Sequence, residues 1–231
     1  MKLVLIGGGD IGRNNTKYET AKIDNYVVKL SSKVKPNFLF IGLASSFSDS
    51  YYKYIKDIYG NLGCETGKIS NKTLKNIDVV KRKIDEADII YIGAGDTLKL
   101  LNLLKEYKMD DMIRSACNRG CVVTGISAGA IALCKSGISD YEIMNNISNN
   151  YVLINGLGII DIMFVPHYNT DDKKALDVKN ILNGTKKVAY CLENCTALSV
   201  VDDKINTIKC SDKAKAYKVY YENKDYIIDE I

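Results

Sequence analysis

The chain has 231 residues, of which 46% are hydrophobic and 26% charged, and its formal net charge is +4. This length favours one α/β domain over residues 1–231, with enough apolar residues to bury a core. The basic residues are mostly scattered lysines without a block of interleaved aromatics, which argues against a nucleic-acid partner. The apolar runs are too short for a membrane span or a signal peptide, so we expect a cytoplasmic protein without a membrane partner.

Strand and helix patterns alternate through the first two-thirds of the chain. Apolar runs bounded by turn residues predict strands at residues 2–6, 38–41, 64–69, 88–92, 121–124 and 159–165. Apolar spacing predicts helices at residues 16–30, 48–62, 74–87 and 98–104, a further helix that ends at about residue 119, and helices at 130–134 and 171–182. Strands at residues 188–191 and 196–201 and hairpin-like alternation at 205–208 and 217–228 follow. This order predicts a mostly parallel sheet with helices on both faces and antiparallel strands at the C-terminal end.

Two polar stretches interrupt this alternation after the fifth strand. Residues 135–142 read as a polar loop, and the asparagine-rich residues 145–150 read as an exposed excursion. Neither stretch divides the chain into domains.

A glycine-rich segment directly follows the first predicted strand. Residues 7–12, Gly-Gly-Gly-Asp-Ile-Gly, match the G-x-G-x-x-G pattern of dinucleotide-binding folds. That function requires a helix to open inside the motif, whereas residues 13–15, Arg-Asn-Asn, are typical of a turn. A flexible loop at the carboxyl end of a strand is therefore favoured over a nucleotide site, and such loops often line a ligand site.

Residues 125–129 read Gly-Ile-Ser-Ala-Gly, a G-x-S-x-G pattern with a predicted strand before it and a predicted helix after it. In this context the serine occupies a strained turn with its hydroxyl exposed above the sheet, and the glycines avoid clashes there. The N–H groups that open the helix can stabilise an oxyanion. A tight turn without chemistry is the alternative, because the five-residue pattern alone is common.

A serine nucleophile needs a base within hydrogen-bond reach. His167 is the one histidine of the chain, and it follows a predicted strand that ends at the same sheet edge as Ser127. A third group should orient the imidazole. Asp140 and Glu142 lie between serine and histidine in the chain, an order found in sheet-based hydrolases, and Glu193 is a further option.

The seven cysteines lie in or beside apolar stretches and form no C-x-x-C pair, so most are expected to be small buried hydrophobic residues. Two pairs, Cys117/Cys121 and Cys191/Cys195, have i, i+4 spacing. A zinc site would need more ligands than these pairs and one histidine supply. We therefore expect neither a metal nor another cofactor.

Three segments taken together resemble the peptidase E (aspartyl dipeptidase) family of serine peptidases, to which cyanophycinase is related. They are residues 93–97, Gly-Ala-Gly-Asp-Thr, residues 125–130, Gly-Ile-Ser-Ala-Gly-Ala, and residues 165–168, Val-Pro-His-Tyr. Residues 193–198, Glu-Asn-Cys-Thr-Ala-Leu, also resemble a strand turn of those enzymes. The resemblance extends from about residue 1 to residue 201.

This resemblance implies a flavodoxin-like fold, the fold of class I glutamine amidotransferases, with serine in place of their cysteine. It implies that Ser127 is the nucleophile and His167 the base. It also implies that the backbone N–H groups of Gly95 and Ala128 form the oxyanion hole.

The family places the acid of the triad in the loop after the nucleophile helix, where Asp140 fits best and Glu142 next. The chain departs from aspartyl dipeptidases at Ala94 and Asp96, where those enzymes tend to have glycine and asparagine. We expect a small-peptide substrate, with dipeptides that carry an N-terminal acidic residue as one candidate. A ligand-binding or regulatory protein without turnover is the alternative. A homodimer is one option that the sequence leaves open.

Overall fold

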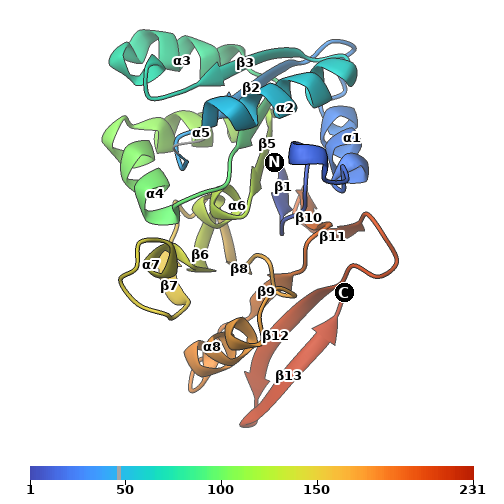
Figure 1. The fold of residues 1–231 in the computed structure, drawn as a ribbon, viewed down its shortest axis with the longest axis vertical. Helices are drawn as coiled ribbons and strands as arrows, with labels where there is room; N and C mark the ends of the chain where they lie inside the picture. The colour runs from blue at the N-terminus through green and yellow to red at the C-terminus, as the bar shows by residue number, and fades with distance from the viewer. Residues whose placement is uncertain (46–47) are drawn as a thin grey trace.

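The computed structural model describes residues 1–45 and 48–231. Its described strands form two sheets, shown with their helices in Figure 1. The first sheet has the order β11-β10-β1-β5-β4-β2-β3, in which β1, β5, β4, β2 and β3 run parallel. Its strands are β1 (Lys2–Ile6), β2 (Asn37–Ile41), β3 (Glu65–Ile69), β4 (Ile89–Ile92), β5 (Val122–Ile126), β10 (Thr196–Val201) and β11 (Lys204–Lys209).

The second sheet has the order β13-β12-β9-β8-β6-β7, and β6, β8 and β9 run parallel in it. Its strands are β6 (Cys134–Ser139), β7 (Val152–Asn155), β8 (Ile160–Val165), β9 (Ala189–Leu192), β12 (Ala216–Glu222) and β13 (Asp225–Glu230). The mostly parallel α/β architecture is confirmed, but the strands divide between two sheets. The helix between β5 and β6 has only six residues. Because a parallel crossover within one sheet needs about a dozen, β6 begins a new sheet.

Helices cover both faces of the first sheet (Figure 1). The α-helices are α1 (Ala21–Leu30), α2 (Ser48–Asn61), α3 (Ile77–Glu86), α4 (Thr97–Glu106), α5 (Met109–Asn118), α6 (Ala128–Leu133), α7 (Tyr141–Met144) and α8 (Asp172–Leu182). Short 3-10 helices lie at Arg13–Asn15 and Thr73–Lys75. Among the described residues, no helix combines the length and apolar character that a membrane crossing requires.

Strand β1 shows why the parallel strands read as continuous apolar runs. Leu3 and Leu5 pack into the apolar cluster that includes residues of α3, α4, α5 and α6. Val4 and Ile6 pack into the opposite cluster, which includes residues of α1 and α2. Successive side chains of a strand point to opposite faces, and here both faces are buried.

The first α-helix begins at Ala21 instead of at residue 16. The buried Asp24 carboxylate accepts hydrogen bonds from the Tyr18 hydroxyl at 2.8 Å and from the Thr20 hydroxyl at 2.7 Å. These side-chain bonds hold the residues before Ala21 in a loop that the apolar spacing alone does not reveal.

The prediction of a polar loop over residues 135–142 was wrong. This stretch contains most of strand β6 and the start of α7. Ser139 is buried, and its hydroxyl donates to the buried Thr97 hydroxyl at 2.8 Å. Gly137 permits a close approach to β8, since a Cβ atom there would lie 2.6 Å from the Phe164 carbonyl oxygen. Small polar residues with internal partners thus form a buried strand.

Candidate active site

Ser127 occupies the turn between β5 and α6, in the strand–turn–helix context that the sequence predicted. Its φ of 52° and ψ of −115° are unusual for a residue other than glycine. A Cβ atom at Gly125 would lie 2.4 Å from the Gly129 carbonyl oxygen, and one at Gly129 would lie 2.2 Å from the Ile92 carbonyl oxygen. Both glycines of the pattern are therefore required for the backbone to make this turn.

His167 follows β8 and lies against Ser127. Its Nε2 atom is 3.0 Å from the Ser127 Oγ atom. Like the serine, it has a positive φ, 53°, and its backbone N–H donates to the Gly7 carbonyl oxygen at 3.0 Å. The ends of β1, β5 and β8 thus meet at one place, and this brings the predicted nucleophile and base within hydrogen-bond reach.

The other imidazole nitrogen contacts an asparagine. Nδ1 of His167 lies 2.6 Å from Oδ1 of Asn194, which is in the turn between β9 and β10. The backbone N–H of Asn194 donates to the Asn169 side-chain oxygen at 3.1 Å. An amide oxygen can only accept a hydrogen bond, so Nδ1 must carry the proton in this contact. Nε2 is then the unprotonated nitrogen, with its lone pair available to the serine hydroxyl.

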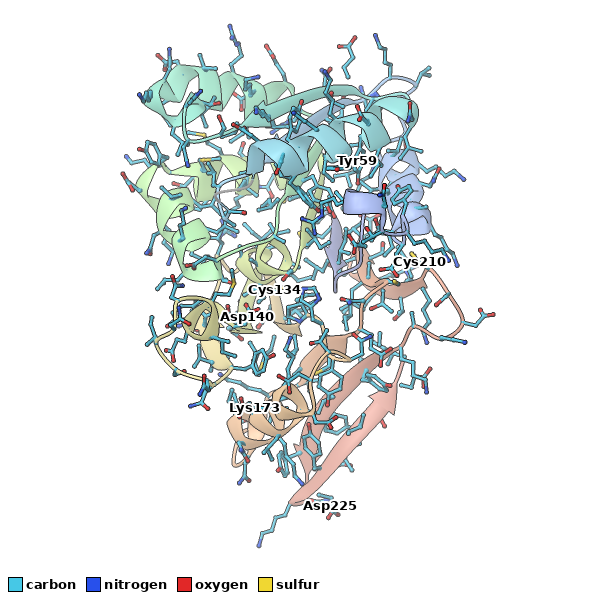
Figure 2. All side chains as sticks on the ribbon, in the orientation of Figure 1. Tyr59, Cys134, Asp140, Lys173, Cys210 and Asp225 are labelled. Atoms are coloured by element: carbon cyan, nitrogen blue, oxygen red, sulfur yellow. The ribbon has the colours of Figure 1, made fainter. Side chains whose placement is uncertain are left out.

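Among the described residues, none of the carboxylates that the sequence offered for this position is hydrogen-bonded to Nδ1 of His167. Asp140 precedes α7, where Figure 2 labels it. The Glu142 carboxylate accepts hydrogen bonds from the Ser148 hydroxyl at 2.8 Å and the Tyr141 hydroxyl at 3.3 Å. The Glu193 carboxylate accepts from the backbone N–H of Lys215 at 3.0 Å. At Nδ1 the structure has the Asn194 amide, which the sequence reasoning missed although it adjoins Glu193 in the noted turn.

The environment of His167 keeps its imidazole neutral. Burial lowers the pKa of His167 below its ordinary value, and the positive charge of Lys174 acts in the same direction. The hydrogen bond to Asn194 and the negative charge of Asp140 raise this pKa, but they do not offset the burial. A neutral imidazole at pH 7 can accept a proton from the serine.

The first glycine loop packs directly against this pair. Gly8 has a φ of 150°, and a Cβ atom there would lie 2.4 Å from His167 Nδ1 and 2.2 Å from Asn194 Oδ1. The Gly8 carbonyl oxygen accepts a hydrogen bond from the backbone N–H of Cys195 at 2.9 Å. The loop leads into the 3-10 helix Arg13–Asn15 and not into an α-helix that opens within the motif. The absence of a side chain at Gly8 thus leaves room for the imidazole of His167 and the side-chain amide of Asn194.

A pocket of about 530 Å³ opens over the serine, a volume within the usual range of ligand sites. Ser127, His167 and Gly95 line this pocket, together with Arg13, Tyr51, Tyr54 and residues at the end of β2.

Gly95 has a φ of 139°, and a Cβ atom there would lie 2.4 Å from the Ala44 carbonyl oxygen. Ala128 is the first residue of α6, so its N–H has no partner within the helix. Gly95 thus lies in a tight turn at the pocket, and Ala128 lies next to Ser127.

Arg13 supplies a positive charge to this pocket. Its guanidinium lies 5.1 Å from the centroid of the Tyr51 ring, and its Nε atom lies 3.9 Å from the Asp10 carboxylate. The Arg13 side chain is 47% exposed, so it can reach a bound ligand from the wall of the pocket. Arginine suits carboxylate groups because its N–H donors match their two oxygens.

A mostly parallel α/β fold in which a serine in a sharp strand–helix turn pairs with a histidine defines a hydrolase of the serine-peptidase type. Comparison with known families makes this more specific. The chain belongs to peptidase family S51, whose family model matches residues 3–208.

Individual relatives support this membership. The chain is 29% identical to the uncharacterized peptidase YgaJ of Bacillus subtilis (strain 168) over 220 residues, which cover 94% of this chain and 91% of YgaJ. It is 26% identical to peptidase E of Nostoc sp. over 173 residues, which cover 72% of this chain and 64% of that protein. The resemblance to peptidase E is confirmed.

The fold has a counterpart among solved structures. The crystal structure of a peptidase from an acI-B1 Actinobacterium matches with a TM-score of 0.73 and 20% identity, over 100% of this chain and 96% of that chain. This similarity concerns the fold and confirms the flavodoxin-like, glutamine amidotransferase-like class that the sequence predicted.

Proposed function

We propose that this protein hydrolyses small peptides with Ser127 as the nucleophile and His167 as the general base. The observation that carries the proposal is the distance of 3.0 Å between Ser127 Oγ and His167 Nε2, with the serine in a strained turn that lines the pocket. The serine oxygen attacks the scissile carbonyl carbon while its proton passes to Nε2. His167 then protonates the leaving amine, and a water molecule hydrolyses the acyl-enzyme by the reverse sequence of proton transfers.

In this proposal Asn194 takes the place of the carboxylate expected at Asp140 or Glu142. Its side-chain oxygen, 2.6 Å from Nδ1 of His167, supports a role in holding the imidazole ring and its tautomer. Papain-like proteases combine their nucleophile and histidine with an asparagine, so an amide is compatible with this chemistry. Asp140 then acts at longer range, through the negative charge that favours protonated His167.

The backbone N–H groups of Gly95 and Ala128 are proposed to bind the oxyanion. Gly95 lines the pocket from the loop after β4, and Ala128 directly follows Ser127 at the start of α6. Such groups are fixed by the backbone before the substrate arrives, so they stabilise the developing charge without reorganisation.

The pocket lining supports substrates that combine a carboxylate with a short peptide. Arg13 offers a cation for a carboxylate, and the rings of Tyr51 and Tyr54 offer apolar walls. Dipeptides with an N-terminal aspartate or glutamate are the first candidates. The volume of about 530 Å³ is compatible with a ligand of this size.

A fluorophosphonate probe combined with a dipeptide panel tests the proposal. The probe is expected to label Ser127, as located by peptide mass spectrometry, and the Ser127→Ala variant should remain unlabelled. The panel pairs N-terminal Asp and Glu with Asn, Gln, Ala and Leu, and Ser127→Ala should reduce turnover by about 10⁴-fold or more. Undiminished hydrolysis in Ser127→Ala would overturn the assignment. Binding of a panel peptide without labelling or turnover would favour the ligand-binding alternative.

A further inference from the structure

Lys174 is a buried lysine directly behind the candidate base. It lies in the first turn of α8, next to Lys173, which Figure 2 labels, and it is only 3% exposed. Its Nζ atom donates to the Pro166 carbonyl oxygen at 3.1 Å and to the His167 carbonyl oxygen at 3.2 Å. Nζ also lies 4.6 Å from the centroid of the Tyr151 ring. Because a buried ammonium group is costly to desolvate, its presence here calls for a reason.

The backbone that Lys174 contacts is strained. His167 has a φ of 53°, in the left-handed region that residues other than glycine seldom adopt. Its carbonyl oxygen also accepts hydrogen bonds from the Thr170 hydroxyl at 2.8 Å and the Thr170 N–H at 3.2 Å. Such a conformation persists only where the surroundings hold it, and Lys174 supplies the charged donor among these contacts.

The charge on Lys174 is partly balanced by its neighbours. Burial lowers the pKa of Lys174 to about 8, while the negative charges of Asp140 and Asp171 act to raise it, and the Cys191 thiol is a further titratable neighbour. The ammonium group therefore remains mostly protonated at pH 7. These groups, together with His167 and the Tyr151 ring, are the charged and titratable neighbours that the structure brings to Lys174.

We propose that Lys174 is a positioning residue, whose ammonium group fixes the carbonyls of Pro166 and His167 and thereby aims the imidazole at Ser127. The effect on rate rests on the proposed function, whereas the placement of the imidazole does not. Two consequences follow. Loss of Lys174 frees the turn, so Nε2 is less often within reach of the serine oxygen. It also removes a positive charge beside the imidazole, so the pKa of His167 rises.

His167 is the one histidine of the chain, so an NMR titration of imidazole signals reports on it without ambiguity. The test compares wild type with Lys174→Met and with the matched control Lys179→Met, which removes an exposed lysine from the same helix. Lys174→Met is expected to raise the His167 pKa and to slow fluorophosphonate labelling of Ser127 about tenfold or more. Lys179→Met should leave both quantities at their wild-type values.

Removal of the Lys174 charge raises the His167 pKa whether or not the ammonium group positions the ring, so the labelling rate is the decisive measurement. It is compared at a pH at which the imidazole is neutral in both proteins. A merely structural role for Lys174 would lower the melting temperature without slowing labelling of the folded protein, and a rate within twofold of wild type in folded Lys174→Met would overturn the proposal. If Lys174→Met does not fold, Lys174→Gln carries the test, because it also removes the charge, and a rate within twofold of wild type would again overturn the proposal. Labelling needs no turnover of peptide, so a wild-type protein that is labelled but cuts no peptide would contradict the proposed function and leave the test of Lys174 intact.

Discussion

The side-chain oxygen of Asn194 lies 2.6 Å from Nδ1 of His167, where serine peptidases of the trypsin type have a carboxylate. An amide at this position fixes the ring and its tautomer, but it adds no negative charge. In the proposed mechanism, the imidazolium is therefore stabilised less than it would be beside an aspartate. Asn194 lies in the turn that connects β9 of the second sheet to β10 of the first. The contact between Asn194 and His167 therefore depends on how the two sheets pack against each other.

Removal of the Asn194 amide should impair His167 as a base, and a negative charge in its place should raise the pKa of His167. Asn194→Ala is expected to lower kcat/KM by about 100-fold, because the imidazole loses its orientation. Asn194→Asp is expected to remain active with the acidic limb of its kcat/KM profile at higher pH, since a carboxylate favours protonated His167. The exposed Asn180→Ala serves as the control. A larger loss in Asp140→Asn than in Asn194→Ala would instead support the carboxylate predicted from the sequence.

The pH dependence of the wild type should follow the depressed pKa of His167. Burial disfavours the protonated imidazole, and only the neutral form can accept the serine proton. kcat/KM should therefore rise with pH through a midpoint below the ordinary histidine value of about 6.5 and be level by pH 7. Initial rates at low substrate concentration give this midpoint, and the NMR titration of His167 should agree with it. A midpoint above 6.5 would contradict the effect of burial.

A methyl group at Gly8 should displace the base. The added Cβ atom would lie 2.4 Å from the imidazole and 2.2 Å from the Asn194 oxygen, so one of these groups must move. Gly8→Ala is expected to lower kcat about 100-fold or more with a smaller change in KM. Gly60→Ala is the matched control, because a Cβ atom at this exposed helical position meets nothing within 4 Å. Equal kcat values for both variants would show that the loop does not fix the base.

Arg13 should determine the preference for acidic substrates. Arg13→Gln removes the cation from the pocket wall, so kcat/KM for Asp and Glu dipeptides should fall about 10-fold to 100-fold, as expected for a charged hydrogen bond. The values for Ala and Leu dipeptides should change little. Arg82→Gln, at an exposed position of α3, provides the control. A uniform fall across the panel would mean that Arg13 supports the pocket without recognising a carboxylate.

Local sequence patterns were sufficient to predict the parallel strands of the first sheet, the turn at Ser127 and the position of His167 after a strand. These features depend on short-range effects: apolar runs that must be buried, and glycines that permit close backbone approach. The expectation that Ser127 and His167 share one sheet edge was wrong, because β5 belongs to the first sheet and β8 to the second. The same reasoning failed for residues 135–142, because the burial of Ser139 depends on a hydroxyl partner in α4.

The amino-acid sequence by itself thus determined the class of fold, the serine and the histidine. Only the tertiary structure decided that Asn194 faces the imidazole, that Gly8 makes room for it and that Lys174 lies behind it. An asparagine, a glycine and a lysine are common in turns and on helices, and the residues beside them in the chain do not show which atoms they contact. Those roles arise because the ends of β1, β8 and β9 converge, which is a long-range outcome of packing two sheets together.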